Sequence, residues 1–355
     1  MEAYSRHQRR ASSETGASER GPEARPPHEK YWMTDGNLYV STWSDRIGLA
    51  SANAQTRLGG IQRNPSGAAA TLTGQSWNAS AARRAIQEFV ARVTSLKNPD
   101  YLPAPERIAV FDDDGTLWPE LPLPAHIECA LDGFASMARQ RPELKPLPMY
   151  GPALDRDLAW FAPYLQDDRL PELVQALDQA LEGETQSALE ARISRWLATA
   201  KHPRFGRPYL GLAFVPMVEL LGFLQSNGFK VFILSSGVDF VRMVSVEVFN
   251  IPRDRIVRRG SRVGRNRQGR GDPLQTQTRL RRRPVLVCGN GDGDLKMMER
   301  AAAGGKPFLN LVVKHDDADR EYQSSANAEL IQRTAKERGW TTISMAADFR
   351  IVFSD

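Results

Sequence analysis

The stretch that decides the fold runs Arg107-Ile-Ala-Val-Phe-Asp-Asp-Asp-Gly-Thr-Leu-Trp118. Its apolar part, Ile108 to Phe111, is long enough for one buried parallel strand. Three carboxylates follow at once, Asp112 to Asp114, ahead of a glycine and a threonine. In open α/β sheets the reactive groups lie just past the carboxyl ends of the strands. We therefore expect a buried strand that ends in a reactive acidic loop.

Three adjacent carboxylates repel one another unless a cation or a proton neutralises them. Side chains alternate along an extended chain, so Asp112 and Asp114 can point the same way while Asp113 points elsewhere. That arrangement suits one Mg²⁺ ion, held by carboxylate oxygens and by a substrate phosphate. Taken alone, the loop could also be a Ca²⁺-binding loop or a solvated acidic turn.

Two further strand ends carry polar groups. Lys230 to Ser235 is expected to be a buried strand that ends in a hydroxyl, and Ser236-Gly237 opens the next helix. Pro284 to Cys288 is another short apolar run, and the acidic loop Gly289-Asn-Gly-Asp-Gly-Asp294 follows it. Strands that alternate with helices predict an α/β fold with a doubly wound parallel sheet. Such a sheet would bring these loops to one edge.

The same alternation predicts the remaining elements. Further strands are expected within Ile251–Val257, Pro307–Val313 and Trp340–Met345. Helices are expected at Ala81–Leu96, with Ser80 as N-cap, and at Phe214–Ser226, Leu295–Ala303 and Ala326–Gly339.

The sequence Asp-x-Asp-Gly-Thr after an apolar strand resembles motif I of the haloacid dehalogenase (HAD) superfamily. The resemblance implies that Asp112 is the nucleophile and that Asp114 is the general acid/base. Leu-Ser-Ser-Gly resembles motif II, in which a hydroxyl binds the transferring phosphoryl group, and Ser235 takes this role by position. The amides of Ser236 and Gly237 would add to the phosphate cradle at a helix N-terminus.

The acidic loop after the strand at Pro284 resembles motif IV, whose residues coordinate Mg²⁺ in the superfamily. Asn290 stands in the first acidic place and can still ligate through its amide oxygen. Asp294 keeps the family spacing, and Asp292 is a spare carboxylate. An asparagine here resembles a bacterial, phosphoserine-phosphatase-like subset of HAD phosphatases. The implied metal ligands are Asp112, the Asp114 backbone carbonyl, Asn290 and Asp294.

The superfamily also places a lysine, or sometimes an arginine, ahead of motif IV, where it neutralises the nucleophile and the phosphate. No lysine lies between Lys230 and Lys296. Where related bacterial phosphatases would have Gly-Lys-Pro, this chain has Gly271-Asp272-Pro273. Arg270 is adjacent and could stand in as a phosphate-binding cation, although arginine is not a simple replacement for lysine. We therefore expect turnover to be weak or absent.

Between the first two expected strands the chain shows only helical patterns, at Ala125–Gln140, Leu154–Leu165, Leu173–Leu181 and Ser187–Ala200. They resemble the helical cap that many HAD phosphatases insert there, which excludes water and contacts the leaving group. They could also form a second helical domain with no closing motion. We predict a HAD-like core at residues 76–120 and 205–355, with the cap at 121–204. Residues 1–75 lack a periodic apolar pattern and are expected to be a disordered or poorly ordered arm.

The segment from Arg253 to Arg283 holds twelve arginines, no lysine and two acids. It could bind phosphate-rich partners or nucleic acid, yet it lacks interleaved aromatic residues and a reading helix. A mobile basic loop, or a sequence degenerated relative to its relatives, explains it as well. The net charge of the chain, +5, is too small to predict a nucleic-acid partner by itself.

The composition is that of an ordinary soluble globular protein, with 41% hydrophobic and 25% charged residues. No apolar run is long enough to predict a membrane span. The first 30 residues carry charges throughout and lack the apolar region of a secretory signal, so a cytoplasmic location is expected. Cys129 and Cys288 predict neither a disulfide framework nor a metal site.

The resemblance covers roughly residues 80–350 and implies a flavodoxin-like HAD core with an inserted all-helical cap. It implies a Mg²⁺-dependent hydrolase that cleaves a small phosphomonoester through an aspartyl-phosphate intermediate. Two other classes stay open. One is a HAD dehalogenase, which uses the aspartate nucleophile without Mg²⁺. The other is a catalytically weakened descendant that binds phosphorylated or nucleic-acid partners through the arginine-rich segment.

Overall fold

The structure is a computed structural model that describes residues 31–34, 37–40, 72, 74–165, 169, 172–173, 185–259, 282–305, 307–325 and 327–354. The chain divides into two compact units, residues 1–53 and 54–355. In the first unit, β1 (Tyr31–Thr34) pairs with β2 (Asn37–Val40) as an antiparallel hairpin. The rest of the predicted arm lies outside the described residues as far as residue 71.

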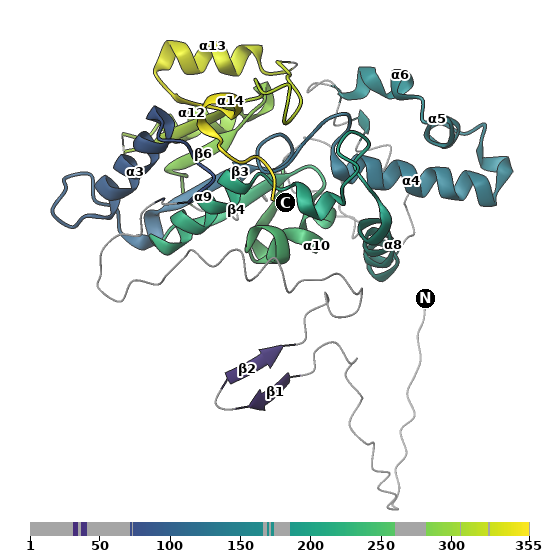
Figure 1. Ribbon diagram of the computed structural model, residues 1–355, viewed down its shortest axis with the longest axis horizontal. Helices are drawn as coiled ribbons and strands as arrows, with labels where there is room; N and C mark the ends of the chain where they lie inside the picture. The colour runs from purple at the N-terminus through teal and green to yellow at the C-terminus, as the bar shows by residue number, and fades with distance from the viewer. Residues whose placement is uncertain are drawn as a thin grey trace, which may run out of the picture. The chain divides into compact units, whose positions relative to one another are not determined.

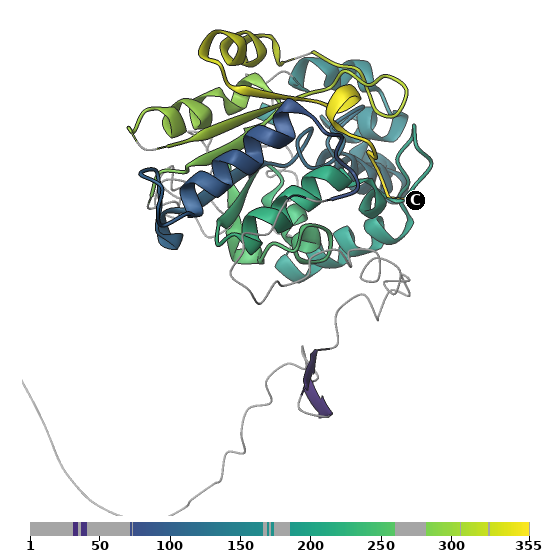
Figure 2. The same ribbon diagram turned by 60° about the vertical axis from the view of Figure 1, so that its left-hand side comes forward.

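Six parallel strands form the sheet of the second unit, in the order β5-β4-β3-β6-β7-β8 (Figure 1). The strands are β3 (Ile108–Asp112), β4 (Lys230–Ser235), β5 (Ile256–Arg258), β6 (Leu286–Gly289), β7 (Leu309–Lys314) and β8 (Thr341–Ser344). The chain enters at the centre, builds outward on one side through β4 and β5, and then builds outward on the other side. Helices lie on both faces (Figures 1 and 2). The predicted doubly wound α/β sheet is confirmed.

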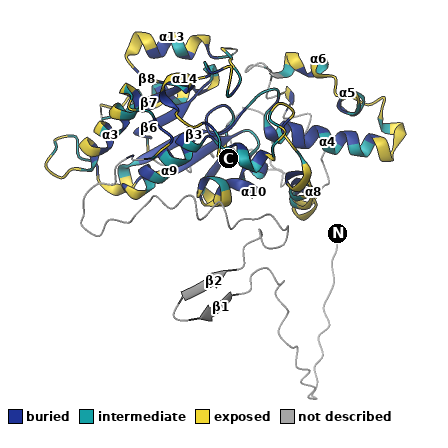
Figure 3. Cartoon of the chain, viewed as in Figure 1, coloured by how far each residue is buried: buried dark blue, intermediate teal, exposed yellow. Residues whose placement is uncertain are grey.

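The central strands are apolar because they are covered on both faces. Every residue of β3 is buried, and so is every residue of β6. In Figure 3 the sheet is dark blue, whereas the outward faces of α8 (Gln186–Thr199) and α13 (Glu329–Arg338) are yellow. On one face of the sheet α12 (Leu295–Ala302) and α13 pack with β6 and β7 around one buried cluster.

The helix boundaries follow the expected capping groups. The Ser80 hydroxyl accepts the Arg83 N–H at 3.2 Å and starts α3 (Ala81–Thr94), as predicted. Helix α9 (Val215–Ser226) ends before Gly228, whose φ of +76° suits a residue without a side chain. Helix α10 (Val238–Phe249) begins three residues after β4, and the short α14 (Met345–Asp348) follows β8.

The described part of the second unit begins at Leu72, inside the arm predicted for residues 1–75. Leu72 is buried, and its carbonyl accepts hydrogen bonds from Arg83 Nε at 3.0 Å and Nη2 at 2.6 Å. Trp77 packs edge-on against Phe349, with ring centroids 5.3 Å apart. These contacts tie the segment before α3 to the C-terminal part of the unit.

The described residues between β3 and β4 form helices and no strand. Ahead of α9 they include α4 (Ala125–Gln140), α5 (Tyr150–Asp155), α6 (Leu158–Phe161), the 3-10 helix η3 (Ala162–Leu165) and α8. These helices gather to one side of the sheet (Figure 1). They have an apolar cluster of their own, made by Leu123, Ile127, Ala130, Leu131, Phe134, Ala138, Met149, Tyr150, Ala153, Phe161 and Leu173.

The prediction of one helix over Leu154–Leu165 is wrong. Helix α5 stops at Arg156, which has a left-handed backbone with φ of +54°. The Asp157 side chain then accepts the Trp160 N–H at 3.0 Å and starts the separate helix α6. The apolar spacing was correct, but a local turn and cap interrupt the helix. The predicted helix at Leu173–Leu181 lies outside the described residues except for Leu173.

No helix among the described residues combines the length and the hydropathy that a membrane crossing requires.

We expect Phe134→Ala to lower the free energy of unfolding by about 3–5 kcal/mol, because it removes a fully buried ring from the helical cluster. That ring packs edge-on against Tyr150, with centroids 5.1 Å apart. Denaturant unfolding monitored by circular dichroism measures the change. Leu158→Ala is the matched control, because 42% of that side chain is exposed, and it should shift stability by less than about 0.5 kcal/mol. Equal effects of the two variants would contradict a packed cluster in this segment.

Candidate active site

The carboxyl ends of β3, β4, β5 and β6 lie at one edge of the sheet, because these neighbouring strands are parallel. The order of the strands along the chain reverses next to β3, and in such sheets ligands bind at this switch point. The loops that follow these strands carry Asp113, Asp114, Ser236, Arg259 and Asn290. The predicted acidic loops and the Ser-Ser-Gly turn therefore share one edge. Arg270 lies outside the described residues.

Arg259 connects the two acidic loops. Its main-chain N–H donates to the Ser235 carbonyl at 2.9 Å, which is a ladder bond of the last β4–β5 pair, Ser235 with Arg258. Its Nη2 atom contacts Asp112 Oδ1 and also lies 2.7 Å from Asp294 Oδ1. Both carboxylates are buried, with exposed fractions of 6% and 2%. Asp112 and Asp294, which are far apart in sequence, thus share one cationic atom.

Burial and neighbouring charges shift the pKa values of the charged groups at this edge. Burial raises the pKa of the Asp112 carboxyl well above its ordinary value, and Arg259 is the main influence that lowers it. Burial and the neighbouring Asp114 raise the pKa of Asp113 to about 7. Burial acts to lower the pKa of Arg259, but Asp112 and Asp294 outweigh it, so that the pKa of the guanidinium is raised. Arg259 therefore stays charged and is the counter-ion of the cluster.

Thr116 links Asp112 to the second acidic loop. Its Oγ1 lies 3.3 Å from Asp112 Oδ2 and 3.0 Å from Asn290 Oδ1. Asn290 Nδ2 donates to Glu120 Oε1 at 3.1 Å. Burial raises the pKa of Glu120 to about 7. These contacts place the amide oxygen of Asn290 on the side of Asp112.

Asp294 is held against the end of β6. Its Oδ2 accepts the main-chain N–H groups of Asn290 at 3.0 Å and of Gly291 at 3.2 Å, which leaves Oδ1 for Arg259. A Cβ at Gly289 would lie 2.5 Å from Asp294 Cγ, so only a glycine admits the carboxylate here. The last residue of β6 thus lacks a side chain for a steric reason.

Asp114 has partners of its own. The buried indole of Trp118 donates from Nε1 to Asp114 Oδ1 at 3.0 Å. His126 of α4 places Nδ1 3.2 Å from Asp114 Oδ2, and its Nε2 lies 3.2 Å from Ser236 Oγ. Burial acts to lower the pKa of His126, but the Asp114 carboxylate outweighs it, and the pKa is raised. Asp112 and Asp114 therefore contact different partners.

The polar groups of the Ser-Ser-Gly turn differ in how far they are buried. Ser235 is fully buried, and its hydroxyl donates to Asp113 Oδ2 at 2.8 Å. Ser236 and Gly237 are partly exposed and precede α10. A phosphoryl group at Ser235 would have to compete with the Asp113 carboxylate for the same hydroxyl, whereas the groups at Ser236 and Gly237 are more accessible.

Three residues at this edge were missed by the sequence analysis: Glu120, His126 and Arg259. Arg259 had a usable signal, because it lies two residues past the expected strand at Val257 and therefore at the same edge as the motif loops. No sequence signal pointed to His126 or Glu120, because only the tertiary structure brings these residues to the strand ends.

Asp292 is not spare. Its carboxylate accepts the main-chain N–H of Ile331 at 2.7 Å and that of Leu330 at 3.3 Å, at the start of α13. His315, just past β7, is likewise structural, because Nε2 lies 2.7 Å from the Gly115 carbonyl and Nδ1 lies 2.9 Å from Glu321 Oε2. These residues fix the loops that surround the site.

The fit of the site to Mg²⁺ rests on its oxygen donors. Among the described residues, no group of three or more His, Cys, Asp or Glu side chains is placed to hold a metal. However, the carboxylates of Asp112 and Asp294 already converge on one cationic atom, and Asn290 Oδ1 is joined to Asp112 through Thr116. Mg²⁺ typically takes one or two carboxylates, with water and substrate phosphate completing its shell. The donor set therefore fits the ion.

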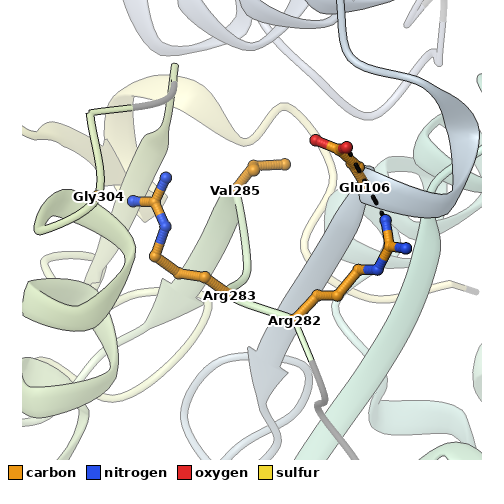
Figure 4. Close-up of a pocket in the computed structure, with 5 residues that line it drawn as sticks. All are labelled: Glu106, Arg282, Arg283, Val285 and Gly304. Carbon is orange, nitrogen blue, oxygen red and sulfur yellow. Dashed lines mark ion pairs between the residues drawn. The ribbon is translucent and has the colours of Figure 1, made fainter.

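A cavity of about 390 Å³ lies elsewhere and is lined by Glu106, Arg282, Arg283, Val285 and Gly304 (Figure 4). Glu106 and Val285 precede β3 and β6, so this hollow is at the opposite edge of the sheet. Arg283 donates to the Ala301 carbonyl in the last turn of α12, where a cation complements the helix dipole. Arg282 lies 3.9 Å from Glu106. The cavity is thus separate from the acidic site.

No family model and no curated protein matches the sequence. Among solved structures, the chain is similar to a phosphoserine phosphohydrolase-like protein from Francisella tularensis subsp. tularensis SCHU S4. The two share 15% sequence identity, the match covers 67% of this chain and 94% of the other, and the TM-score is 0.37. A similarity this distant carries no argument about function, which has to come from the site itself.

We expect Asp292→Ala to lower the free energy of unfolding by about 1 kcal/mol, because the first turn of α13 loses its acceptor. Asp292→Asn should lose less, since an amide oxygen still accepts a hydrogen bond. Thermal and denaturant unfolding measure both variants. Asp319→Ala, at an exposed position, is the control and should change stability by less than about 0.5 kcal/mol. A neutral Asp292→Ala would contradict the capping role.

Proposed function

We propose that this chain is a Mg²⁺-dependent phosphomonoester hydrolase of the HAD type that works through a phosphorylated Asp112. The observation that carries the proposal is the meeting of Asp112 and Asp294 at one nitrogen of Arg259, at the switch point of a doubly wound sheet. An anionic nucleophile and an anionic substrate can react only where positive charge is gathered. This edge of the sheet holds both the carboxylates and the positive charge of Arg259.

The first step is an attack by the Asp112 carboxylate on phosphorus. A bond forms between that oxygen and phosphorus, the bond from phosphorus to the ester oxygen breaks, and Asp114 gives its proton to the leaving oxygen. Thr116 orients the nucleophile through the contact of 3.3 Å with Asp112 Oδ2. The amides at Ser236 and Gly237, at the start of α10, support the phosphoryl oxygens.

The second step regenerates the enzyme. Water attacks the same phosphorus, Asp114 takes the proton from that water, and the bond between phosphorus and Asp112 breaks to release inorganic phosphate. Asp112, Asn290 and Asp294, with the Asp114 carbonyl on the same loop, would hold Mg²⁺, which when bound supplies charge that offsets the repulsion between carboxylates and phosphate.

Arg259 can take the role of the missing lysine. Arg270 was the expected cation, but Arg259 already contacts the nucleophile carboxylate. Its guanidinium can neutralise Asp112 and the incoming phosphate as the family lysine does, so the absence of a lysine does not by itself predict an inactive enzyme. The helices between β3 and β4 would act as the cap that limits access to this edge, and they carry His126 to it.

We expect Asp112→Asn to lower kcat for p-nitrophenyl phosphate by more than about a thousandfold, because the amide cannot form the acyl phosphate. EDTA should abolish the turnover of the unmodified enzyme, and Mg²⁺ should restore it. Asp319→Asn is the control and should keep full activity. Equal background rates for the unmodified enzyme and Asp112→Asn would favour a non-catalytic descendant. Turnover of a 2-chloro acid, independent of Mg²⁺, would instead indicate a dehalogenase.

We expect Arg259→Gln to lower kcat/KM by about 10²–10³-fold, because positive charge next to the nucleophile is lost. Arg259→Lys should retain more activity than the glutamine variant, since it keeps the positive charge although it loses the planar guanidinium. The exposed Arg253→Gln is the control with the same chemical change. Steady-state kinetics with p-nitrophenyl phosphate give the comparison, and an Arg259→Gln variant as active as the control would exclude this role.

A further inference from the structure

His126 connects α4 to the loops at the strand ends. It lies in the first turn of α4, and its side chain is 8% exposed. The ring spans two loops, with Nδ1 3.2 Å from Asp114 Oδ2 and Nε2 3.2 Å from Ser236 Oγ. One imidazole thus joins a helix outside the sheet to the loops after β3 and β4.

The lack of a side chain at Gly237 allows His126 to lie this close to the loop after β4. A Cβ at Gly237 would lie 2.6 Å from His126 Cβ and closer still to Cγ. The φ of Gly237 is −91°, which any residue can adopt, so the backbone does not require a glycine. The atoms that a side chain would meet are near the His126 backbone and cannot swing away. The missing side chain therefore makes room for His126.

The Asp114 carboxylate is faced by two ring nitrogens. Trp118 Nε1 donates to Oδ1 at 3.0 Å, and His126 Nδ1 faces Oδ2. Within the described part of the chain, Nδ1 is buried and makes no aligned hydrogen bond. Contacts of this kind at active sites often tighten only when the substrate binds. Each carboxylate oxygen keeps a second lone pair, so the acid can still carry a proton.

We infer that His126 is a positioning residue for Asp114: it directs Nδ1–H at the acid, contacts the Ser236 hydroxyl through Nε2, and so ties the orientation of Asp114 to the place of α4. This inference rests on the proposed function. When Asp114 gives its proton to the leaving oxygen, the new carboxylate is stabilised by the N–H groups of His126 and Trp118. No proton moves onto His126, so the proton balance of the reaction is unchanged.

A residue that positions the general acid affects poor leaving groups more than good ones, which a purely structural residue does not do. A nitrophenolate leaves phosphorus almost without a proton, whereas a phenolate without the nitro group is more basic and depends on the acid. We expect His126→Ala to lower kcat/KM about 30–100-fold for phenyl phosphate and less than about threefold for p-nitrophenyl phosphate. The two substrates have similar shapes, and kcat/KM reports the steps up to phosphoryl transfer, which isolates the acid.

Two conservative variants test the contacts of the two His126 ring nitrogens one at a time. The amide of His126→Asn lies near Nδ1 and keeps a donor to Asp114, so most of the phenyl phosphate activity should return. The amide of His126→Gln lies near Nε2 and keeps only the Ser236 contact, so this variant should behave like His126→Ala. Gly237→Ala displaces the ring, so its loss should be larger on phenyl phosphate than on p-nitrophenyl phosphate, on top of any equal loss on both substrates that comes from the phosphate cradle. Gly211→Ala is the matched control, since its Cβ would meet only Arg207 Nη2, at 3.7 Å.

Equal losses on both substrates in His126→Ala would overturn the inference, as would no loss on either. Asparagine and glutamine variants with the same leaving-group pattern would also overturn it. Thermal unfolding of each variant identifies any that fail to fold, and Gly237→Ala tests the same contact with His126 intact. The proposed function fails separately: turnover in Asp112→Asn equal to that of the unmodified enzyme removes the reaction itself, whatever His126 does.

Discussion

The site depends on one electrostatic constraint: carboxylates buried at the end of a strand need a positive charge beside them. Asp112 and Asp294 are both buried, and they face each other across the ends of two neighbouring strands. Arg259 supplies the charge at a single nitrogen. The main-chain bond from Arg259 to Ser235 fixes where this arginine leaves the sheet, so the sheet register sets the charge balance.

Glycines at the strand ends make the close approaches possible. Gly115 has a φ of +74°, and a Cβ there would lie 2.7 Å from Asn290 Cγ. Gly289 leaves space for the Asp294 carboxylate, and Gly237 leaves space for the ring of His126. The first glycine is required by both conformation and space, and the other two by space alone. Together they let side chains from distant segments reach hydrogen-bond distance.

Local sequence pattern was sufficient to predict several elements of the fold. Strand β4 and helix α4 have the predicted bounds, because an unbroken apolar run and a clean 3.6-residue period mark them. The acidic loops could be placed at one edge because parallel strands share their carboxyl ends. The break at Arg156 escaped prediction, since a left-handed residue other than glycine leaves little trace in the pattern.

The residues that escaped prediction at the site did so for different reasons. Arg259 belongs to an arginine-rich segment, from which the motif spacing selected Arg270 instead. His126 lies on a helix whose period was predicted, but the contact of its ring with Asp114 depends on how that helix packs against the sheet. Periodicity gives the face of a helix but not its distance from a loop. Chemistry made by tertiary contact is therefore the least predictable part of the site.

The position of His126 has a consequence for how the site would work. The helices between β3 and α9 have their own apolar cluster, so under the proposed cap role they would hold their shape while their placement against the sheet changes. Any shift of α4 moves His126 relative to Asp114 and Ser236, whereas Trp118 stays with the loop of the acid. The nucleophile, Asp112, has no such contact with α4 among the described residues. Under the proposed function, closure over a substrate would thus be felt first by the acid that protonates the leaving group.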